Sequence, residues 1–150
     1  MNLIKYQLIQ FLIMFIVGIF FNPMNILSYN INHFYISLTL VYGGLLMASN
    51  MIWSHEIVHY LYKKHFNIYL FLFGITLSFI ISIFLLRKQL FISDNQWLKR
   101  MISHHSTALT TSNKIIKKSN NNNIKKLAND IIITQENEIK IMKSLLNNKM

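Results

Sequence analysis

The sequence predicts an all-α protein in which three transmembrane helices are followed by a helical hairpin. Two observations lead to this fold class. The runs 6–31, 34–54 and 66–86 contain no charged side chain, and residues beyond 93 place apolar residues with the 3.6-residue period of a helix. An apolar fraction of 53% and a mean hydropathy of +0.34 are high for a soluble domain of 150 residues.

Three membrane spans are predicted at about 5–22, 33–53 and 67–86, within a membrane region of residues 1–88. Each run supplies the ~20 residues that a helix needs to cross the hydrocarbon core. A small soluble domain could not cover three adjacent helices that are apolar all round. The first span is interpreted as an uncleaved anchor, because no small-residue cleavage signature follows it. We therefore expect a multi-pass integral membrane protein whose partner is the lipid bilayer.

The charge of the chain is concentrated in its C-terminal part. Of the net charge of +10, residues 87–150 contribute twelve basic and four acidic side chains. No interleaving of aromatic and basic residues and no reading motif accompanies this charge, so we expect no nucleic-acid partner. The basic residues that flank the spans give no clear orientation. The absence of cysteine excludes disulfides and thiolate metal sites.

Residues 89–150 are predicted to form the hairpin domain. Ser93–Gln96 has the pattern of a capping box that opens a helix to about Lys118, and the polar run 119–123 is typical of a turn before a second helix. A hairpin of this size buries too little apolar surface to be stable alone. Its inner face, with Trp97, Met101, Ile115, Ile131 and Leu145, stays exposed unless it pairs. We therefore expect a homo-oligomer that completes a four-helix bundle.

Polar side chains interrupt the apolar stripe of both predicted helices. His104 and His105 lie on the first, and Gln135, Glu138 and Met142 follow at i, i+3 and i+7 on the second. Burying such groups costs free energy unless they are paired or bind a ligand. In an antiparallel hairpin turning near Asn121, the two runs lie within about one helical turn of each other. The predicted site consists of His104, His105, Gln135, Glu138, Met142 and Met101.

Two interpretations of this site remain open. Imidazole and thioether ligands suit copper, whereas imidazole and carboxylate suit zinc or iron, so the cluster predicts a transition-metal cofactor with copper favoured. The alternative is a non-catalytic structural or interaction module whose His, Gln and Glu side chains form a buried polar network. Enzyme activity is not expected, because ferritin-like oxidases use several carboxylates and a Glu-x-x-His pattern that this hairpin lacks.

The same residues carry a family resemblance. The runs M-I-x-H-H-x-x-A-L from Met101 and Q-x-x-E-I-x-x-M from Gln135 resemble the ferritin-like domain-of-unknown-function family 305 over residues 94–146. The resemblance implies a hairpin of a four-helix bundle and, for some soluble members, copper handling. Those members usually carry Met where this chain has Thr111. The pair Thr111-Ser112 looks more like the membrane-anchored branch, and the resemblance favours an extracytoplasmic C-terminal domain.

Two further patterns lie in the second predicted span. His55-Glu-Ile-Val-His59 matches the zinc-protease motif H-E-x-x-H, but without an identified third ligand we interpret it as a chance match. Methionine and histidine also recur every four residues on one helix face, as possible secondary metal ligands. The residues of this stripe are Met47, Met51, His55 and His59. Helix packing is the favoured interpretation, because Gly43, Gly44, Ala48 and Ser49 indicate close helix contact.

Overall fold

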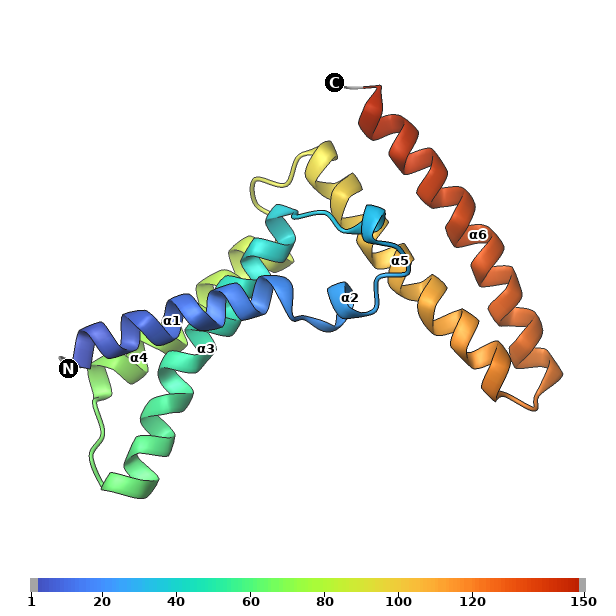
Figure 1. Ribbon diagram of the computed structural model, residues 1–150. Coiled ribbons are helices and arrows are strands. Elements are labelled where there is room, and N and C mark those ends of the chain that lie inside the picture. Colours follow the sequence, from blue (N-terminus) through green and yellow to red (C-terminus); the bar gives the residue numbers. More distant parts are fainter. Residues whose placement is uncertain (1–2, 149–150) are drawn as a thin grey trace. The chain divides into compact units, whose positions relative to one another are not determined.

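The computed structural model describes residues 3–148, and these residues contain helices and no strand. They form two compact units. The N-terminal unit combines the residues up to Phe21 with Leu38–Ile92, and the hairpin unit combines Asn22–Ser37 with the residues from Ser93 onward. The all-α prediction is confirmed for the described part of the chain, and Figure 1 follows its helices in order.

The N-terminal unit packs three long helices through small residues. Its helices are α1 (Leu3–Phe20), α3 (Leu38–Lys63) and α4 (Ile68–Ile80), which continues as a π-helix, η2 (Ile81–Arg87). A Cβ atom on Gly44 of α3 would lie 3.0 Å from the carbonyl oxygen of Phe15 in α1. One on Gly74 of α4 would lie 2.9 Å from the backbone nitrogen of Trp53 in α3. These glycines therefore let both α1 and α4 approach α3 closely.

The prediction of three spans of membrane-crossing character is corrected to two. The stretches Lys5–Ile26 and Ile68–Arg87 are long and apolar enough to cross a membrane. The second predicted span, 33–53, does not correspond to a helix: residues 34–37 precede α3, and α3 extends to Lys63. The mean hydropathy of α3 is lowered by the Ser, Asn, His and Glu side chains between Ser49 and His59, all of which lie on this one helix.

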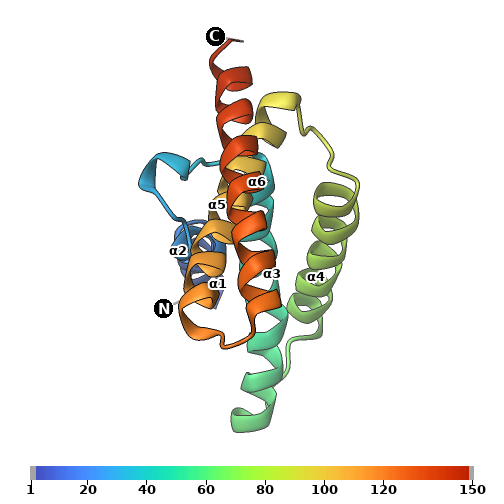
Figure 2. The same cartoon turned by 90° about the vertical axis from the view of Figure 1, so that its right-hand side faces the viewer.

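The hairpin unit is built on α5 (Asp94–Lys118) and α6 (Asn122–Asn147), which run side by side in opposite directions (Figures 1 and 2). Ser93 occupies the N-cap of α5 as predicted, but its side chain makes no capping hydrogen bond. Asn121 caps α6, because its side-chain oxygen accepts from the backbone nitrogens of Asn123 and Ile124. The core between the helices consists of Leu98, Ile102, Leu109, Ile139, Met142 and Leu146.

The segment between α1 and α3 also belongs to the hairpin unit. It contains the short helices α2 (Pro23–Ile26) and η1 (Ile31–His33). The Ser106 hydroxyl of α5 accepts from the backbone nitrogen of Tyr29 at 2.8 Å, and the Thr107 hydroxyl donates to the carbonyl of Met24 at 3.1 Å. The unit therefore starts at Asn22 and resumes at Ser93, whereas the predicted domains meet at residues 88 and 89.

Candidate functional site

The predicted polar cluster assembles around His105. This residue is buried on α5, and its Nε2 lies 2.7 Å from Glu138 Oε2 on α6. Its Nδ1 lies 2.8 Å from the carbonyl oxygen of Met101, one turn earlier on the same helix. Gln135 donates from Nε2 to the same Glu138 oxygen at 3.2 Å. The antiparallel hairpin therefore brings His105, Gln135 and Glu138 together.

The contact to the Met101 carbonyl constrains the tautomer of His105. A carbonyl oxygen only accepts, so Nδ1 must carry a proton toward Met101. When Nε2 is protonated as well, it donates a charge-assisted hydrogen bond to the Glu138 carboxylate. The Glu138 side chain is 46% exposed, against 11% for His105. The pair therefore lies at the edge of the core, and solvent screens part of its interaction.

The other three predicted ligands are placed differently. His104 is exposed, and its ring centroid lies 5.9 Å from that of His105 in an edge-on arrangement. Met142 belongs to the apolar core of the hairpin, and Met101 packs against that core. Within residues 3–148, no three His, Asp or Glu side chains are grouped so that they could hold a metal ion.

A polar seam between α5 and the segment 22–37 escaped the sequence analysis. Ser106 is fully buried and lies 3.1 Å from Nδ1 of His33, while the Ser103 hydroxyl donates to the His33 carbonyl at 2.9 Å. Burial lowers the pKa of His33 below its ordinary value of 6.5, and the nearby charge of Lys143 lowers it further. The signal in the sequence is the spacing of Ser103, Ser106, Thr107 and Thr110, which puts four hydroxyls on one face of α5.

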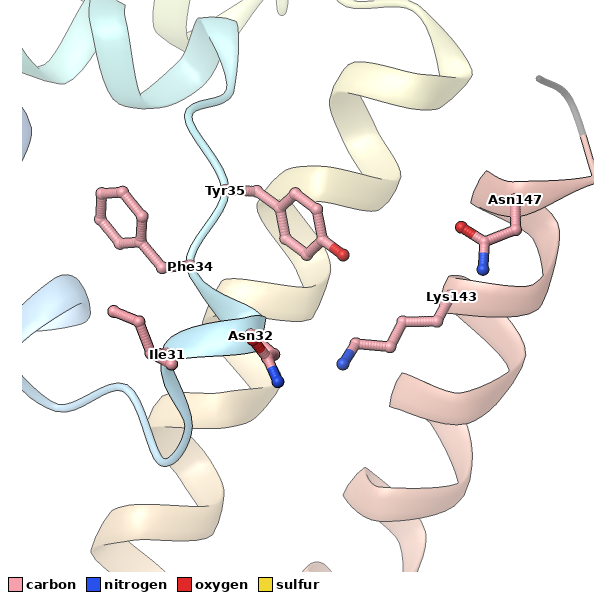
Figure 3. Close-up of a pocket in the computed structure, with 6 residues that line it drawn as sticks. All are labelled: Ile31, Asn32, Phe34, Tyr35, Lys143 and Asn147. Carbon is pink, nitrogen blue, oxygen red and sulfur yellow. The ribbon is translucent and has the colours of Figure 1, made fainter.

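Two clefts open between this segment and α6. The larger, of about 490 Å³, is lined by Ile31, Asn32, Phe34, Tyr35, Lys143 and Asn147 (Figure 3). The smaller, of about 290 Å³, is lined by Tyr29, Asn30, His33, Leu109, Glu136, Ile139, Lys140 and Lys143. Lys143 is the residue that both clefts share.

The H-E-x-x-H match lies near the end of α3 and is held in a different polar cluster. Glu56 is almost fully buried, and its two oxygens accept from the backbone nitrogen of Asn67 at 3.0 Å and from Gln7 Nε2 at 3.5 Å. The carboxylate thereby links α3 to α1 and to the turn before α4. The His55 and His59 rings stack with their centroids 5.7 Å apart. Both oxygens of Glu56 accept hydrogen bonds from the protein, so the carboxylate stabilises the packing of α3 against α1 and the turn before α4.

The methionines predicted to share this helix face are packing residues in part. Met47 contacts the α1 crossing, because a Cβ atom on Gly18 would lie 3.2 Å from its sulfur. Met51 is half-buried one turn further along α3. His55 lies 3.0 Å from Gln7 through Nδ1, and 3.9 Å from Glu56. As secondary metal ligands these residues stay a prediction.

The chain was compared with known proteins. Residues 89–149 match the family model described as "Domain of unknown function (DUF305)". The chain is also 37% identical over 136 residues to "Uncharacterized protein L153" of Acanthamoeba polyphaga mimivirus. The matched region covers 90% of this chain and 87% of the relative. No solved structure matches. The similarity to the viral protein is longer than the family match, so it extends into the N-terminal unit. By the family match and this relative, the chain belongs to the DUF305 family.

Proposed function

We propose that this chain is a non-catalytic, membrane-anchored member of the DUF305 family whose hairpin is an interaction module that pairs with a second copy. The N-terminal unit is the anchor. Only 11% and 17% of the two membrane-crossing stretches is buried within the protein, whereas the core helices of a soluble protein are mostly buried. Large apolar side chains such as Phe73 and Phe79 face outward. A bilayer is the surrounding in which that exposure is stable.

Although α3 is less apolar than the two membrane-crossing stretches, we propose that it crosses the membrane with them, because it packs against both. It contacts α1 at Gly44 and α4 at Gly74, so it lies between the two apolar helices along their length. Reporter fusions after residues 27, 62 and 150 test this topology. Three spans place 27 and 150 on one side, which we expect to be extracytoplasmic, and 62 on the other. If only α1 and α4 cross, residues 27 and 62 report the same side, and the three-span proposal fails.

One observation carries the assignment of the hairpin to a structural role. Both ring nitrogens of His105 bind groups of the protein, one within α5 and one on α6. A side chain engaged in this way ties the two helices at one height, since the bond forms only in one register. The His105→Ala variant should loosen the α5–α6 pairing, seen as faster amide hydrogen exchange at the core positions. Unchanged exchange in that variant would remove the polar network as a determinant of the hairpin.

A second copy of the hairpin is the partner that fits its exposed face. On each helix, residues spaced three and four apart form one stripe. Each stripe residue comes directly before a position that faces the core between the helices, as Trp97 comes before Leu98. In an antiparallel pair, both stripes then lie on the same side of the hairpin. The stripes are Trp97, Met101, His104, Ala108, Thr111 and Ile115 on α5, and Leu127, Ile131, Thr134, Glu138, Ile141 and Leu145 on α6.

The composition of this face favours another helical hairpin over lipid. Trp97 and Leu145 at one end, and Ile115 and Leu127 at the other, are exposed apolar side chains. Between them lie polar groups, including His104 and the half-exposed Glu138. Polar groups are costly against hydrocarbon, but a facing helix can satisfy them, and the heptad-like spacing is that of packed helices.

Two matched substitutions test the pairing. Leu127 lies on the stripe and Ile133 lies off it, and both are 61% exposed. Leu127→Lys should abolish the dimer seen by crosslinking and by light scattering in mild detergent, while Ile133→Lys should leave it intact. Equal behaviour of the two variants, or a wild-type chain that stays monomeric, would contradict pairing through this face.

Metal binding at the same cluster is a second candidate, favoured by the way His105 is anchored. Its Nδ1 is held by the Met101 carbonyl, so Nε2 faces Glu138. That orientation is the one in which protein histidines bind metals, with the other nitrogen hydrogen-bonded. The donors that meet here, an imidazole, a carboxylate and an amide, suit zinc, and copper needs the softer His104, Met101 or Met142 groups to join them.

The metal candidate has its own test. Metal analysis of the purified protein after exposure to Cu⁺, Cu²⁺ or Zn²⁺ should find stoichiometric metal in the wild type. His105→Ala and Glu138→Ala should lose it, while His65→Ala, in the N-terminal unit, should retain it. Acidification should release the metal, because protons compete for the imidazole. Equal metal content in the wild type and in a His104/His105 double alanine variant would exclude this site.

A further inference from the structure

The larger cleft of the hairpin unit gathers hydrogen-bond donors. Figure 3 shows Lys143 reaching from α6 toward Asn32, while the Tyr35 hydroxyl and the Asn147 amide point into the same space. Ammonium, hydroxyl and amide groups from two segments thus line one opening of about 490 Å³. Cavities of roughly 300–1,000 Å³ are the usual size of ligand sites. The donor set suits an anion with several acceptor oxygens.

The electrostatics of the cleft have the matching sign. Lys143 takes part in neither the His55–Glu56 nor the His105–Glu138 ion pair. Its charge reaches His33 in the adjoining cleft, because it contributes to lowering the pKa of that imidazole. Lys140 lines the adjoining cleft as well, and Glu136 is the acidic side chain there. The cleft region therefore carries two ammonium groups against one carboxylate.

The segment that forms one wall of the cleft has an apolar outer side. Ile31 is 81% exposed and Ile26 is 67% exposed, and Figure 3 shows Ile31 and Phe34 directed away from Lys143. This segment leads from α1 into α3, and Tyr35 lies three residues before α3 begins. The segment follows α1 directly, so it begins near the level at which that apolar stretch leaves the bilayer. Exposed Ile beside a basic opening is the pattern of an interfacial segment that meets lipid headgroups.

We propose that the cleft between Asn32, Tyr35, Lys143 and Asn147 binds the phosphate group of an anionic lipid headgroup. The proposal rests on the membrane anchoring proposed above. Lys143 supplies the charge, and the hydroxyl and amide groups supply directed hydrogen bonds to the phosphate oxygens. The exposed isoleucines of the segment contact the acyl region beside it. Headgroup binding thereby attaches the hairpin unit to a membrane surface.

His33 provides a reporter for the test. An anion bound at Lys143 offsets the ammonium charge, so the pKa of His33 should rise toward its ordinary value when the cleft is filled. The full chain is placed in nanodiscs of phosphatidylcholine alone or of phosphatidylcholine with phosphatidylglycerol in equal amounts. The His33 ring resonance, identified by its loss in His33→Gln, is followed by NMR as a function of pH in both lipids.

The expected result is an upward displacement of the His33 titration in the anionic nanodiscs. Lys143→Gln should abolish the difference between the two lipids, whereas Lys114→Gln, which removes the same charge from α5 outside both clefts, should keep it. A difference that survives in Lys143→Gln would reflect the general surface potential and would overturn the proposal. So would identical titrations of the wild type in the two lipids.

A third arm separates the sources of phosphate. In neutral detergent, inorganic phosphate at the concentration of the lipid headgroups should leave the His33 titration unchanged. A displacement as large as that in anionic nanodiscs would assign the cleft to free phosphate and overturn the lipid assignment. Flotation of the chain with vesicles tests the anchor independently: a chain that floats but shows no lipid-dependent titration refutes the headgroup site alone.

Discussion

The two units of this chain place their apolar side chains in opposite ways. In the N-terminal unit the buried positions include Gly44, Ala48 and Ser49, while Phe73 and Phe79 are exposed. In the hairpin unit Ile102 and Leu109 are almost fully buried, and the exposed positions include the asparagines of α6 and two of its four lysines. The N-terminal unit thus buries small residues and exposes large apolar ones, whereas the hairpin unit buries large apolar residues and exposes polar ones.

The difference shows what drives packing in each unit. In water, helices associate because burial removes apolar area from the solvent. In a bilayer the surroundings are as apolar as the side chains, so close contact between small residues and interhelical hydrogen bonds hold helices together. The Ser78 hydroxyl donates to Ser49 at 3.0 Å, and Gly44 and Gly74 lie at the helix crossings. The N-terminal unit follows the second rule, as its proposed place in the membrane requires.

The largest contrast should come from truncating large apolar residues in the two units. Ile102→Ala or Leu109→Ala removes a buried side chain and should destabilise the hairpin by about 2–5 kcal/mol. Phe79→Ala in α4 removes a side chain that is 64% exposed and should change the stability of the N-terminal unit far less. Denaturation of the full chain in detergent, followed by circular dichroism, measures both. Equal losses would refute the contrast between the units.

Enlarging a small residue at a helix crossing of the N-terminal unit should have a smaller destabilising effect. A side chain at Gly44 meets Phe15 and Ile19, so Gly44→Val should cost about 1–3 kcal/mol by overpacking. Gly43 next to it has open space at its Cβ position. Gly43→Ala should therefore stabilise α3 by up to about 1 kcal/mol through helix propensity. Thermal unfolding in detergent compares the two, and a tolerated Gly44→Val would place the α1–α3 crossing elsewhere.

Polar contacts should have modest effects in both units. Removing the half-exposed Glu138 carboxylate by Glu138→Gln should cost about 1 kcal/mol, because solvent screens the pair. Ser78→Ala should cost about 0.6 kcal/mol, as hydrogen bonds between membrane helices average. Double-mutant cycles with His105→Ala and Ser49→Ala isolate the two pair energies. A coupling near zero for His105 and Glu138 would leave the hairpin register to apolar packing.

The smallest effect is a pH dependence that arises from His33 in the hairpin unit. The pKa of His33 is lowered, so the folded state binds a proton less readily than the unfolded chain. Its contribution to stability is therefore constant above the ordinary value of 6.5 and is lost as pH falls through the lower, folded pKa. Lys143→Gln removes one of the two causes and should make the acid loss smaller. Urea denaturation between pH 7.5 and pH 4.5, compared for the two proteins, measures it; an unchanged acid loss would exclude the influence of Lys143.

Several features could be predicted from local sequence. The end of α5 at Lys118, the turn before Asn122 and the approach of His105 to Gln135 and Glu138 follow from helical periodicity and from the rise per residue. The limits of α3 did not follow. Charge-free runs mark where lipid is tolerated, but a helix continues through Asn50, His55 and Glu56 when neighbouring elements satisfy those groups, as Gln7 and the Asn67 backbone do for Glu56.

By itself, the sequence determined that this protein is helical, apolar in its first part and amphipathic in its last, because these properties depend on side chains a few residues apart. Tertiary structure alone decided that Asn22–Ser37 packs with the hairpin and that Lys143 faces a cleft. It also decided that the Ser106 hydroxyl forms hydrogen bonds with the Tyr29 backbone and the His33 ring. Those contacts join residues more than seventy positions apart. They form because buried hydroxyls and backbone groups must find partners wherever the folded chain supplies them, and no local pattern records which partner that is.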